Sequence, residues 1–246
     1  MNKPSLSIVI ASYNEEKRLP PTLEKLFIFL DASKISYEII IVNDGSRDST
    51  KSIVEEMASK RKELKLLSHF PNHGRGASIR EGVLSANGDL ILETDADMSV
   101  DMEAIPRFIK YFEANKDISV LFGSRELRDS VILHHQPFLR VFLGKCFIYL
   151  SKFILWTWDI NDFTLGFKMF RKAAAQDIFS KQYDNHFVAE AEIVLASRKL
   201  GWKFKELPIS WTDNRDSRIS PIRESFRSFK GLIQLRMRAF KGMYNK

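Results

Sequence analysis

Short apolar runs rich in isoleucine, valine and leucine alternate with helix-like segments through the first half of the chain. Five runs have the length and composition of strands: residues 7–10, 38–42, 64–67, 90–92 and 118–122. The connecting segments have the apolar spacing that is typical of helices: residues 21–30, 49–60, 77–86 and 102–114. Strands that are apolar on both faces and separated by helices predict an α/β fold, with a mostly parallel sheet and helices on both faces.

The second half of the chain is more aromatic and more basic. Residues 138–158 have a broad apolar face, which fits either a helix packed on the sheet or a helix in a membrane interface. A turn at residues 161–168 leads into a short strand, and a helix near 188–199 and a strand at 203–211 follow. Residues 222–241 place a basic stripe beside an aromatic stripe, which favours an anionic membrane surface. For any single residue there, a solvated helix face is the alternative.

Composition limits the classes to which the chain can belong. With 246 residues, 44% of them hydrophobic, it can bury a large core. The single cysteine, Cys146, excludes an internal disulfide and a cysteine-rich zinc site, so we expect a reducing compartment. We expect neither a signal peptide nor a membrane span, because no stretch reaches the roughly 18 uninterrupted apolar residues that a span needs.

The net charge of +7 is concentrated at the end of the chain. Residues 214–246 contain nine Lys and Arg against two Asp and Glu, which accounts for the whole net charge. We therefore divide the chain into an α/β domain, residues 1–213, and a basic amphipathic helical tail, residues 214–246. Such a tail indicates an anionic partner, either a nucleic acid or a membrane surface. Because its aromatic residues form one apolar stripe and no nucleic-acid-binding motif is present, we expect a membrane surface and no nucleic acid.

Polar motifs follow the ends of the predicted strands, where α/β sheets bind their ligands. Asp95 and Asp97 come directly after an apolar run, and their spacing lets both carboxylates converge on one divalent cation. An isolated Asp-x-Asp is weak evidence, since surface turns are rich in aspartate. Residues 72–76 form a glycine-rich turn that opens a helix, where backbone amides and Arg75 could hold a phosphate. Together, these motifs at one end of the sheet favour a site for a nucleoside diphosphate.

The ordered motifs resemble those of family 2 inverting glycosyltransferases, which have the Rossmann-like GT-A fold. The matching segments are residues 8–16, 42–50, 72–76, 95–97 (the Asp-x-Asp motif) and 123–125. Within that family the chain is most similar to the polyprenyl-phosphate sugar transferases, namely dolichyl-phosphate glucosyltransferases and mannose synthases. That narrower resemblance rests on residues 162–168, 190–192 and 207–211.

The resemblance implies a role for each matched residue. The nucleotide pocket would be lined by Ala11, Tyr13 and Glu15, with Asp44 on the base and Arg75 near the ribose-phosphate. A Mg²⁺ or Mn²⁺ ion would be held by Asp95, Asp97 and Ser99. The acceptor phosphate would be bound by Arg125, Arg140 and Arg218. Of these residues, Asp97 and Arg125 would take part in catalysis together with Glu190.

Two positions depart from the family pattern, and both bear on the choice of donor. Asn43 stands where the motif usually has aspartate, and Glu190 stands where the glucosyltransferases usually have aspartate. A phosphate monoester is already anionic, so it needs positioning by arginine more than deprotonation. Glu190 would therefore orient the donor or the acceptor, and it would act as a base if the acceptor were an alcohol.

We therefore expect a metal-dependent hexosyltransferase on the cytoplasmic face of a membrane, attached peripherally. It would transfer a hexose, first of all glucose from UDP-glucose, to a polyprenyl or dolichyl phosphate. The alternatives within the class are GDP-mannose as donor, as in dolichyl-phosphate mannose synthase, or a sugar hydroxyl as acceptor. From other classes, the alternatives are a nucleotide-binding module without turnover and a nucleic-acid-binding protein.

Overall fold

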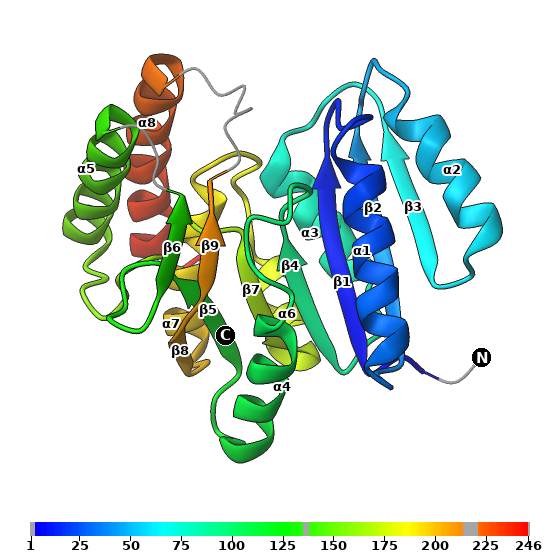
Figure 1. Ribbon diagram of the computed structural model, residues 1–246. Coiled ribbons are helices and arrows are strands. Elements are labelled where there is room, and N and C mark those ends of the chain that lie inside the picture. Colours follow the sequence, from blue (N-terminus) through cyan, green and yellow to red (C-terminus); the bar gives the residue numbers. More distant parts are fainter. Residues whose placement is uncertain (1–2, 135–137, 214–220, 246) are drawn as a thin grey trace. The chain divides into compact units, whose positions relative to one another are not determined.

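The computed structural model (Figure 1) describes residues 3–134, 138–213 and 221–245, without the side chains of residues 138–140, 143 and 221–226. The chain forms two compact units, each made of two segments. Unit 1 consists of Met1–Met98 and Gly166–Ser180, and unit 2 consists of Ser99–Leu165 and Lys181–Lys246.

Unit 1 is built on a sheet in which the strands lie in the order β3, β2, β1, β4, β7. Its strands are β1 (Leu6–Ser12), β2 (Tyr37–Asp44), β3 (Leu64–His69), β4 (Leu90–Thr94) and β7 (Phe167–Arg171). The first four are parallel to their neighbours, and β7 pairs with β4 in the antiparallel direction. The carboxyl ends of β1 to β4 therefore meet at one edge of the sheet.

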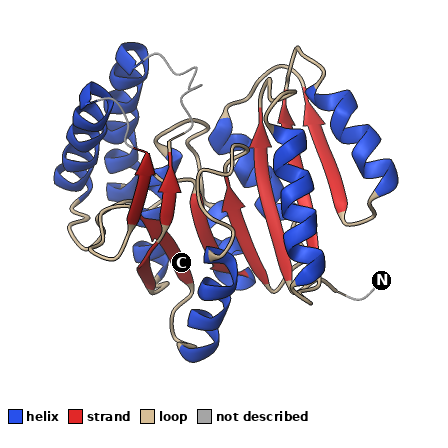
Figure 2. Cartoon of the chain, in the orientation of Figure 1, coloured by secondary structure: helices blue, strands red, loops and turns tan. Residues whose placement is uncertain are grey.

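Helices cover both faces of this sheet, which explains why β1 and β2 are buried almost throughout. The helices are α1 (Leu19–Ala32), α2 (Thr50–Lys60), α3 (Arg75–Ser85) and α6 (Lys172–Ser180). Figure 2 shows α1 in front of the strands and α3 behind them. Helix α3 lies tight on the sheet at Gly82, where an added Cβ would lie 2.4 Å from a methyl carbon of Val9.

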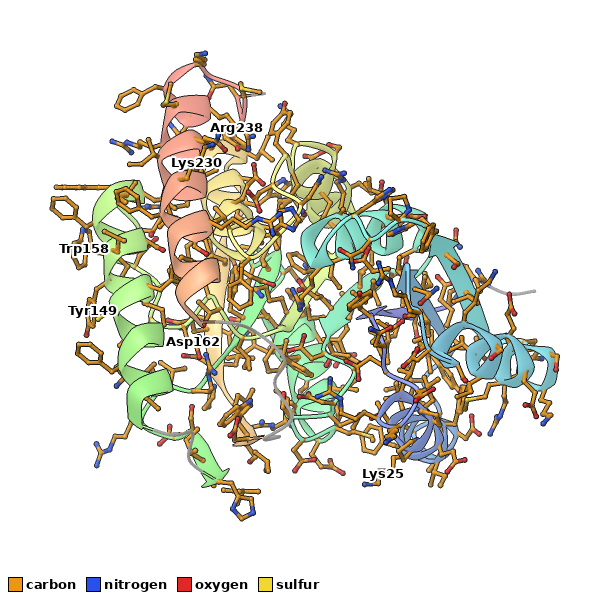
Figure 3. All side chains as sticks on the ribbon, turned by 90° about the horizontal axis from the view of Figure 1, so that it is seen from above. Lys25, Tyr149, Trp158, Asp162, Lys230 and Arg238 are labelled. Carbon is orange, nitrogen blue, oxygen red and sulfur yellow. The ribbon has the colours of Figure 1, made fainter. Side chains whose placement is uncertain are left out.

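Unit 2 contains two short parallel strand pairs and most of the long helices. Strand β5 (Val120–Ser124) pairs with β8 (Phe204–Pro208), and β6 (Val131–His134) pairs with β9 (Ser210–Thr212). The helices are α4 (Ala104–Ala114), α5 (Phe138–Leu155), α7 (Ala189–Leu200) and α8 (Pro221–Phe240). Helix α7 is buried on nearly every side, whereas α5 and α8 pack against each other side by side (Figures 1 and 3).

The predicted α/β fold with a mostly parallel sheet is confirmed, and each predicted strand and helix of the first half is present. The predicted strand at 203–211 is in fact two strands, because the chain leaves β8 and starts β9 with a different partner. Strand β6 and helix α6 were not expected from the pattern. Within the described residues, the structure has no helix with the length and apolar character needed to cross a bilayer.

Candidate active site

The loops that follow β1 and β2 are joined by hydrogen bonds between their backbones and side chains. The backbone N of Asn14 donates to Ser46 Oγ (2.9 Å), and the backbone N of Arg47 donates to Asn14 Oδ1 (2.8 Å). The next amide, that of Glu15, donates to Thr50 Oγ1 (2.7 Å). These contacts join the two loops along one rim of the sheet edge.

The predicted nucleotide-pocket residues of the first motif lie on this rim. Ala11 is half-buried near the end of β1, and the ring of Tyr13 is exposed beyond it. The carboxylate of Glu15 accepts from the guanidinium of Arg18, with Nε to Oε2 at 2.7 Å. The role of Ala11 and Tyr13 in lining a nucleotide stays a prediction, and Glu15 is held by an arginine from the same loop.

Asp44, predicted to bind the base, anchors the loop between β3 and α3. Its carboxylate accepts from the side chain of Asn72 (2.8 Å) and from the backbone N of His73 (2.7 Å) and Gly74 (3.0 Å). The close approach depends on Gly45, which has φ +70° and would place a Cβ 2.8 Å from the backbone N of Asn72. Asp44 therefore fixes the loop that precedes Arg75, and its contact with a base stays a prediction.

The unusual Asn43 uses both ends of its amide group. Its Nδ2 donates to Ser68 Oγ on the neighbouring strand (2.9 Å), and its Oδ1 accepts from the backbone N of Ser46 (3.3 Å). Asn43 is buried, so an amide that both donates and accepts suits this position. Asn43, in place of the usual aspartate, therefore finds a hydrogen-bond partner for each end of its amide, on β3 and in the turn after β2.

Arg75, the first residue of α3, connects the turn before that helix to carboxylates at the end of β4. Its guanidinium donates to Asp95 Oδ1 from NH2 (2.9 Å) and from Nε (3.3 Å), and to Glu93 Oε1 from NH2 (3.0 Å). Glu93 is completely buried, whereas Arg75 and Asp95 are each about one-third exposed. Arg75 thus lies where the sequence placed it, at a helix N-terminus beside the Asp-x-Asp motif.

The Asp95–Asp97 turn is held by a neighbouring helix and by a glycine. Thr22 Oγ1 on α1 donates to the carbonyl of Ala96 between the two aspartates (2.9 Å). A Cβ added to Gly166 would lie 2.3 Å from Asp95 Oδ2 and 2.5 Å from Asp95 Oδ1, so the carboxylate occupies the space that a side chain would fill. The aspartate at this turn is therefore fitted to a glycine brought in ahead of β7.

The donor set of this turn fits Mg²⁺ or Mn²⁺ bound together with a diphosphate. Among the described residues, no group of three or more His, Cys, Asp or Glu side chains lies close enough to hold a metal alone. Magnesium in nucleotide enzymes is bound through one or two carboxylates, with the remaining positions taken by phosphate oxygens and water. Asp95 and Asp97 match that requirement, and a metal held there would stabilise the negative charge of a bound diphosphate.

In unit 2, Arg125, which is partly exposed, forms an ion pair with the fully buried Asp162. Its Nε donates to Asp162 Oδ2 (2.7 Å) and its NH2 donates to Asp162 Oδ1 (3.0 Å) and to Thr164 Oγ1 (3.0 Å). Burial raises the pKa of Asp162, but the charge and hydrogen bonds of Arg125 outweigh it and hold that pKa below 3.8. The guanidinium also lies over the ring of Trp211, 5.3 Å from its centroid. The positive charge of Arg125 is therefore already paired with Asp162. Its contact with an acceptor phosphate stays a prediction.

Glu206, on β8, orients the turn that carries Asp162. Its Oε2 accepts from the backbone N (2.8 Å) and the side-chain Nδ2 (2.9 Å) of Asn161, and its Oε1 accepts from the backbone N of Asp162 (2.8 Å). The two acidic residues and Arg125 thus form one connected group behind the 161–164 turn.

The remaining predicted residues fall in several places. Glu190 is buried in the first turn of α7, and Ser99 is buried, with its carbonyl accepting from the backbone N of Thr212 (2.9 Å). The side chain of Arg140, on α5, and the whole of Arg218 lie outside the described residues. Their proposed roles stay predictions.

Several contacts that support the site were not predicted, although the segment 162–168 had been matched to the family. Glu93 and Gly166 frame Asp95, and Asp162 and Glu206 fix Arg125. A charged residue inside the apolar strand β4 was the available signal for Glu93. For the others the partner is distant in the chain, and only the fold brings the groups together.

The chain is similar to known proteins over most of its length. Residues 7–179 match the model of the family Glycosyl transferase family 2. Among curated relatives, dolichyl-phosphate beta-glucosyltransferase of Dictyostelium discoideum is 30% identical over 97% of this chain and 76% of its own length. Dolichyl-phosphate beta-glucosyltransferase ALG5A of Trichomonas vaginalis is 34% identical over 85% of this chain and 66% of its own length. The human dolichyl-phosphate beta-glucosyltransferase is 27% identical over 97% of this chain and 77% of its own length.

Solved structures resemble the fold at low sequence identity. Glucosyl-3-phosphoglycerate synthase from Mycobacterium tuberculosis, in complex with UDP, has a TM-score of 0.65 at 13% identity, over 95% of this chain and 79% of that one. The mannosyltransferase PcManGT from Pyrobaculum calidifontis, in complex with GDP-Man and Mn²⁺, has a TM-score of 0.59 at 15% identity, over 96% and 70%. These likenesses support the predicted GT-A fold.

Proposed function

Since the chain belongs to glycosyl transferase family 2, we propose that it transfers glucose from UDP-glucose to dolichyl phosphate, with inversion at the anomeric carbon. The main support is that three dolichyl-phosphate glucosyltransferases from distant organisms match this chain. Each match covers at least 85% of the chain, at 27–34% identity. The residues of the site supply a chemical reason for each half of the reaction.

The donor half of the reaction uses the edge of the unit 1 sheet. The rim after β1 and β2 receives the nucleoside, and the turn that Asp44 holds presents the N-terminus of α3, with Arg75, to the diphosphate. Arg75 pairs with Asp95 through a partly exposed contact, which contributes only about 0–1 kcal/mol and can be exchanged for contacts with metal and diphosphate. The site is therefore ready to take up a charged ligand at small cost.

The acceptor half of the reaction needs little proton transfer. A dolichyl phosphate has a second pKa near 6, so it is largely dianionic at neutral pH and attacks without a strong base. Arginine recognises such a group through paired hydrogen bonds, and Arg125, Arg140 and Arg218 are the proposed ligands. Glu190, at the start of α7, orients the reacting groups in this proposal.

We further propose that α5 and α8 lie on an anionic membrane surface, where the lipid acceptor is found. Large apolar side chains are exposed on both helices: Phe142, Tyr149 and Phe153 on α5, and Phe229, Ile233, Met237 and Phe240 on α8. Figure 3 shows Tyr149, and Trp158 just beyond the end of α5, on the outer side of that helix. Exposed basic residues accompany them: Lys145, Arg227, Lys230 and Lys241. An aromatic face beside basic side chains suits the headgroup region.

The membrane proposal is tested by co-sedimentation with liposomes that contain anionic lipid. Binding should weaken as salt rises, because basic residues contribute about 1 kcal/mol each through a screened attraction. It should persist in part through the aromatic side chains. Phe153→Asp should reduce binding at high salt, and Ile28→Asp, at an exposed apolar position on α1 in unit 1, serves as the matched control. Equal binding by the two variants would contradict the proposal.

The transfer proposal is tested with purified protein, Mn²⁺ and a panel of donors. UDP-glucose, other UDP-sugars and GDP-mannose are each offered with dolichyl phosphate or with a soluble sugar acceptor. The proposal expects a lipid product from UDP-glucose. A lipid product from GDP-mannose alone would change the donor, and transfer only to a sugar hydroxyl would change the acceptor class.

A further inference from the structure

The segment of residues 181–188, which leads directly into α7, contacts α8 and its C-terminal extension at successive points. At one end Lys181 Nζ donates to the backbone carbonyl of Asn245. At the other end Val188 packs where Gly231 has no side chain, since a Cβ there would lie 2.7 Å from a Val188 methyl carbon. The guanidinium of Arg227 contacts His186 Nε2 between them. Helix α8 and the residues that follow it therefore contact the 181–188 segment along its length, up to the start of the helix that carries Glu190.

Glu192 is the centre of these contacts. Its side chain is fully buried, and its Oε2 accepts from the backbone N of Tyr183 (3.1 Å) and of Asp184 (2.7 Å). Its Oε1 accepts from the hydroxyl of Tyr244 and lies 3.9 Å from NH1 of Arg238. One carboxylate thus links α7, the 183–184 backbone and the end of the chain.

The turn that ends α8 brings the residues after the helix into this contact. Gly242 has φ +71° after the helix, and the backbone N of Met243 donates to the carbonyl of Arg238 (3.2 Å), which is the Schellman type of helix end. The turn directs Tyr244 back into the protein, where it is fully buried. Its ring packs edge-on against Tyr183, with 5.9 Å between the centroids.

A buried carboxylate is an unusual choice for a purely structural contact. Burial raises the pKa of Glu192 above its ordinary value of 4.5, although Tyr244, the two backbone amides and Arg238 oppose that effect. The charged form is therefore not fully compensated, and well-packed apolar side chains often stabilise such a place better than buried charges do. What the carboxylate provides is directional: it fixes the 183–184 backbone relative to the first turn of α7.

We propose that Tyr244, Arg238 and Glu192 form a latch that positions Glu190 and the 181–188 segment for transfer to the acceptor. The latch rests on the proposed function, because it acts through Glu190. Glu190 and Glu192 lie two residues apart at the start of the same buried helix, so a shift of Glu192 moves Glu190 with it. Tyr244, Arg238 and Glu192 are positioning residues in this proposal, and none of them contacts substrate.

The test is Tyr244→Phe, which keeps the ring and removes the hydroxyl that donates to Glu192. We expect kcat to fall about tenfold, the size of effect expected when a charged group loses one hydrogen bond, with the KM for UDP-glucose unchanged. Hydrogen exchange of the Tyr183 and Asp184 amides should accelerate, while exchange in β1 and β2 should not. The double variant Tyr244→Phe/Glu192→Gln should lose less than the product of the single losses.

The control is Phe112→Leu, a buried position on α4 that is outside the latch and that costs stability without touching it. It should lower the melting temperature and leave kcat unchanged. Arg238→Met, at a partly exposed position, is a second and milder variant, and about a threefold fall in kcat is expected. Normal kcat and normal amide exchange in Tyr244→Phe would overturn the latch. Absence of transfer by the wild type would instead refute the proposed function, and the exchange measurement would still decide whether the latch orders residues 181–188.

Discussion

Gly166→Ala is the substitution for which the structure makes the sharpest prediction. A Cβ at this position would lie 2.3–2.5 Å from the carboxylate atoms of Asp95, closer than any real contact allows. The carboxylate is the end of a side chain, so it can rotate away. It then loses the hydrogen bond that Arg75 NH2 donates to Asp95 Oδ1 (2.9 Å). The substitution therefore moves one proposed metal ligand while leaving the backbone able to fold.

The expected cost to folding is modest. Overpacking of this kind typically costs about 1–3 kcal/mol, and loss of the partly exposed Arg75–Asp95 pair adds at most about 1 kcal/mol. The cost to ligand binding is larger in proportion, since disturbing the groups that orient a metal ligand weakens metal binding about 10- to 100-fold. We expect the melting temperature to fall by a few degrees and the affinity for UDP in the presence of Mn²⁺ to fall by that factor.

The assay is calorimetric titration of UDP with and without Mn²⁺, together with thermal unfolding of the same samples. Gly144→Ala is the matched control, because a Cβ there meets nothing within 4 Å on helix α5. It should raise helix stability by up to about 1 kcal/mol and leave UDP affinity unchanged. If Gly166→Ala bound Mn²⁺ and UDP as tightly as the wild type, the assignment of Asp95 to the metal would be refuted.

Further substitutions test the other parts of the site. Asp97→Ala should abolish Mn²⁺-dependent transfer and leave the fold intact, and wild-type turnover with the metal chelated would contradict the role of this carboxylate. Arg125→Gln should cost about 3–5 kcal/mol of folding free energy, because it leaves buried Asp162 uncompensated; Arg125→Gln/Asp162→Asn should recover most of that stability and none of the acceptor affinity, as measured by the KM for dolichyl phosphate. The lowered pKa of Asp162 means that its stabilising contribution is complete above 3.8 and is lost as the pH falls through the lowered value. Acid unfolding followed by circular dichroism should show that loss in the wild type and not in the double variant.

The alternation of strand and helix was legible in the sequence because parallel strands buried on both faces are continuously apolar. That pattern marked β1 to β5 and the helices between them, and the helical periodicity marked α5, α7 and α8. Strand β6 was missed although Val131, Ile132 and Leu133 form an apolar run, because that run is short and follows β5 without the connecting helix that accompanied the other strands. Helix α6 was missed because it begins directly after β7, with no turn residue to separate the two.

The chemistry of the site was predictable in part for a related reason. Motifs such as Asp95–Asp97 and the turn before Arg75 are contiguous, and parallel strands bring their ends to one edge. The partners of these residues are not contiguous. Glu93 reaches Arg75 across the sheet edge, and Asp162 reaches Arg125 from a turn 37 residues away. Pairings of that kind depend on the tertiary fold, and they had no local pattern from which to be predicted.

The most direct test of the central claim is the product formed from UDP-glucose and dolichyl phosphate in liposomes with Mn²⁺. We expect dolichyl phosphate glucose with the β configuration at the anomeric carbon. Mass spectrometry identifies the product, and the coupling constant between the anomeric carbon and its proton gives the configuration. An α-linked product would contradict inversion. If folded protein that binds UDP and Mn²⁺ formed no glucosylated lipid, that result would contradict the proposed function.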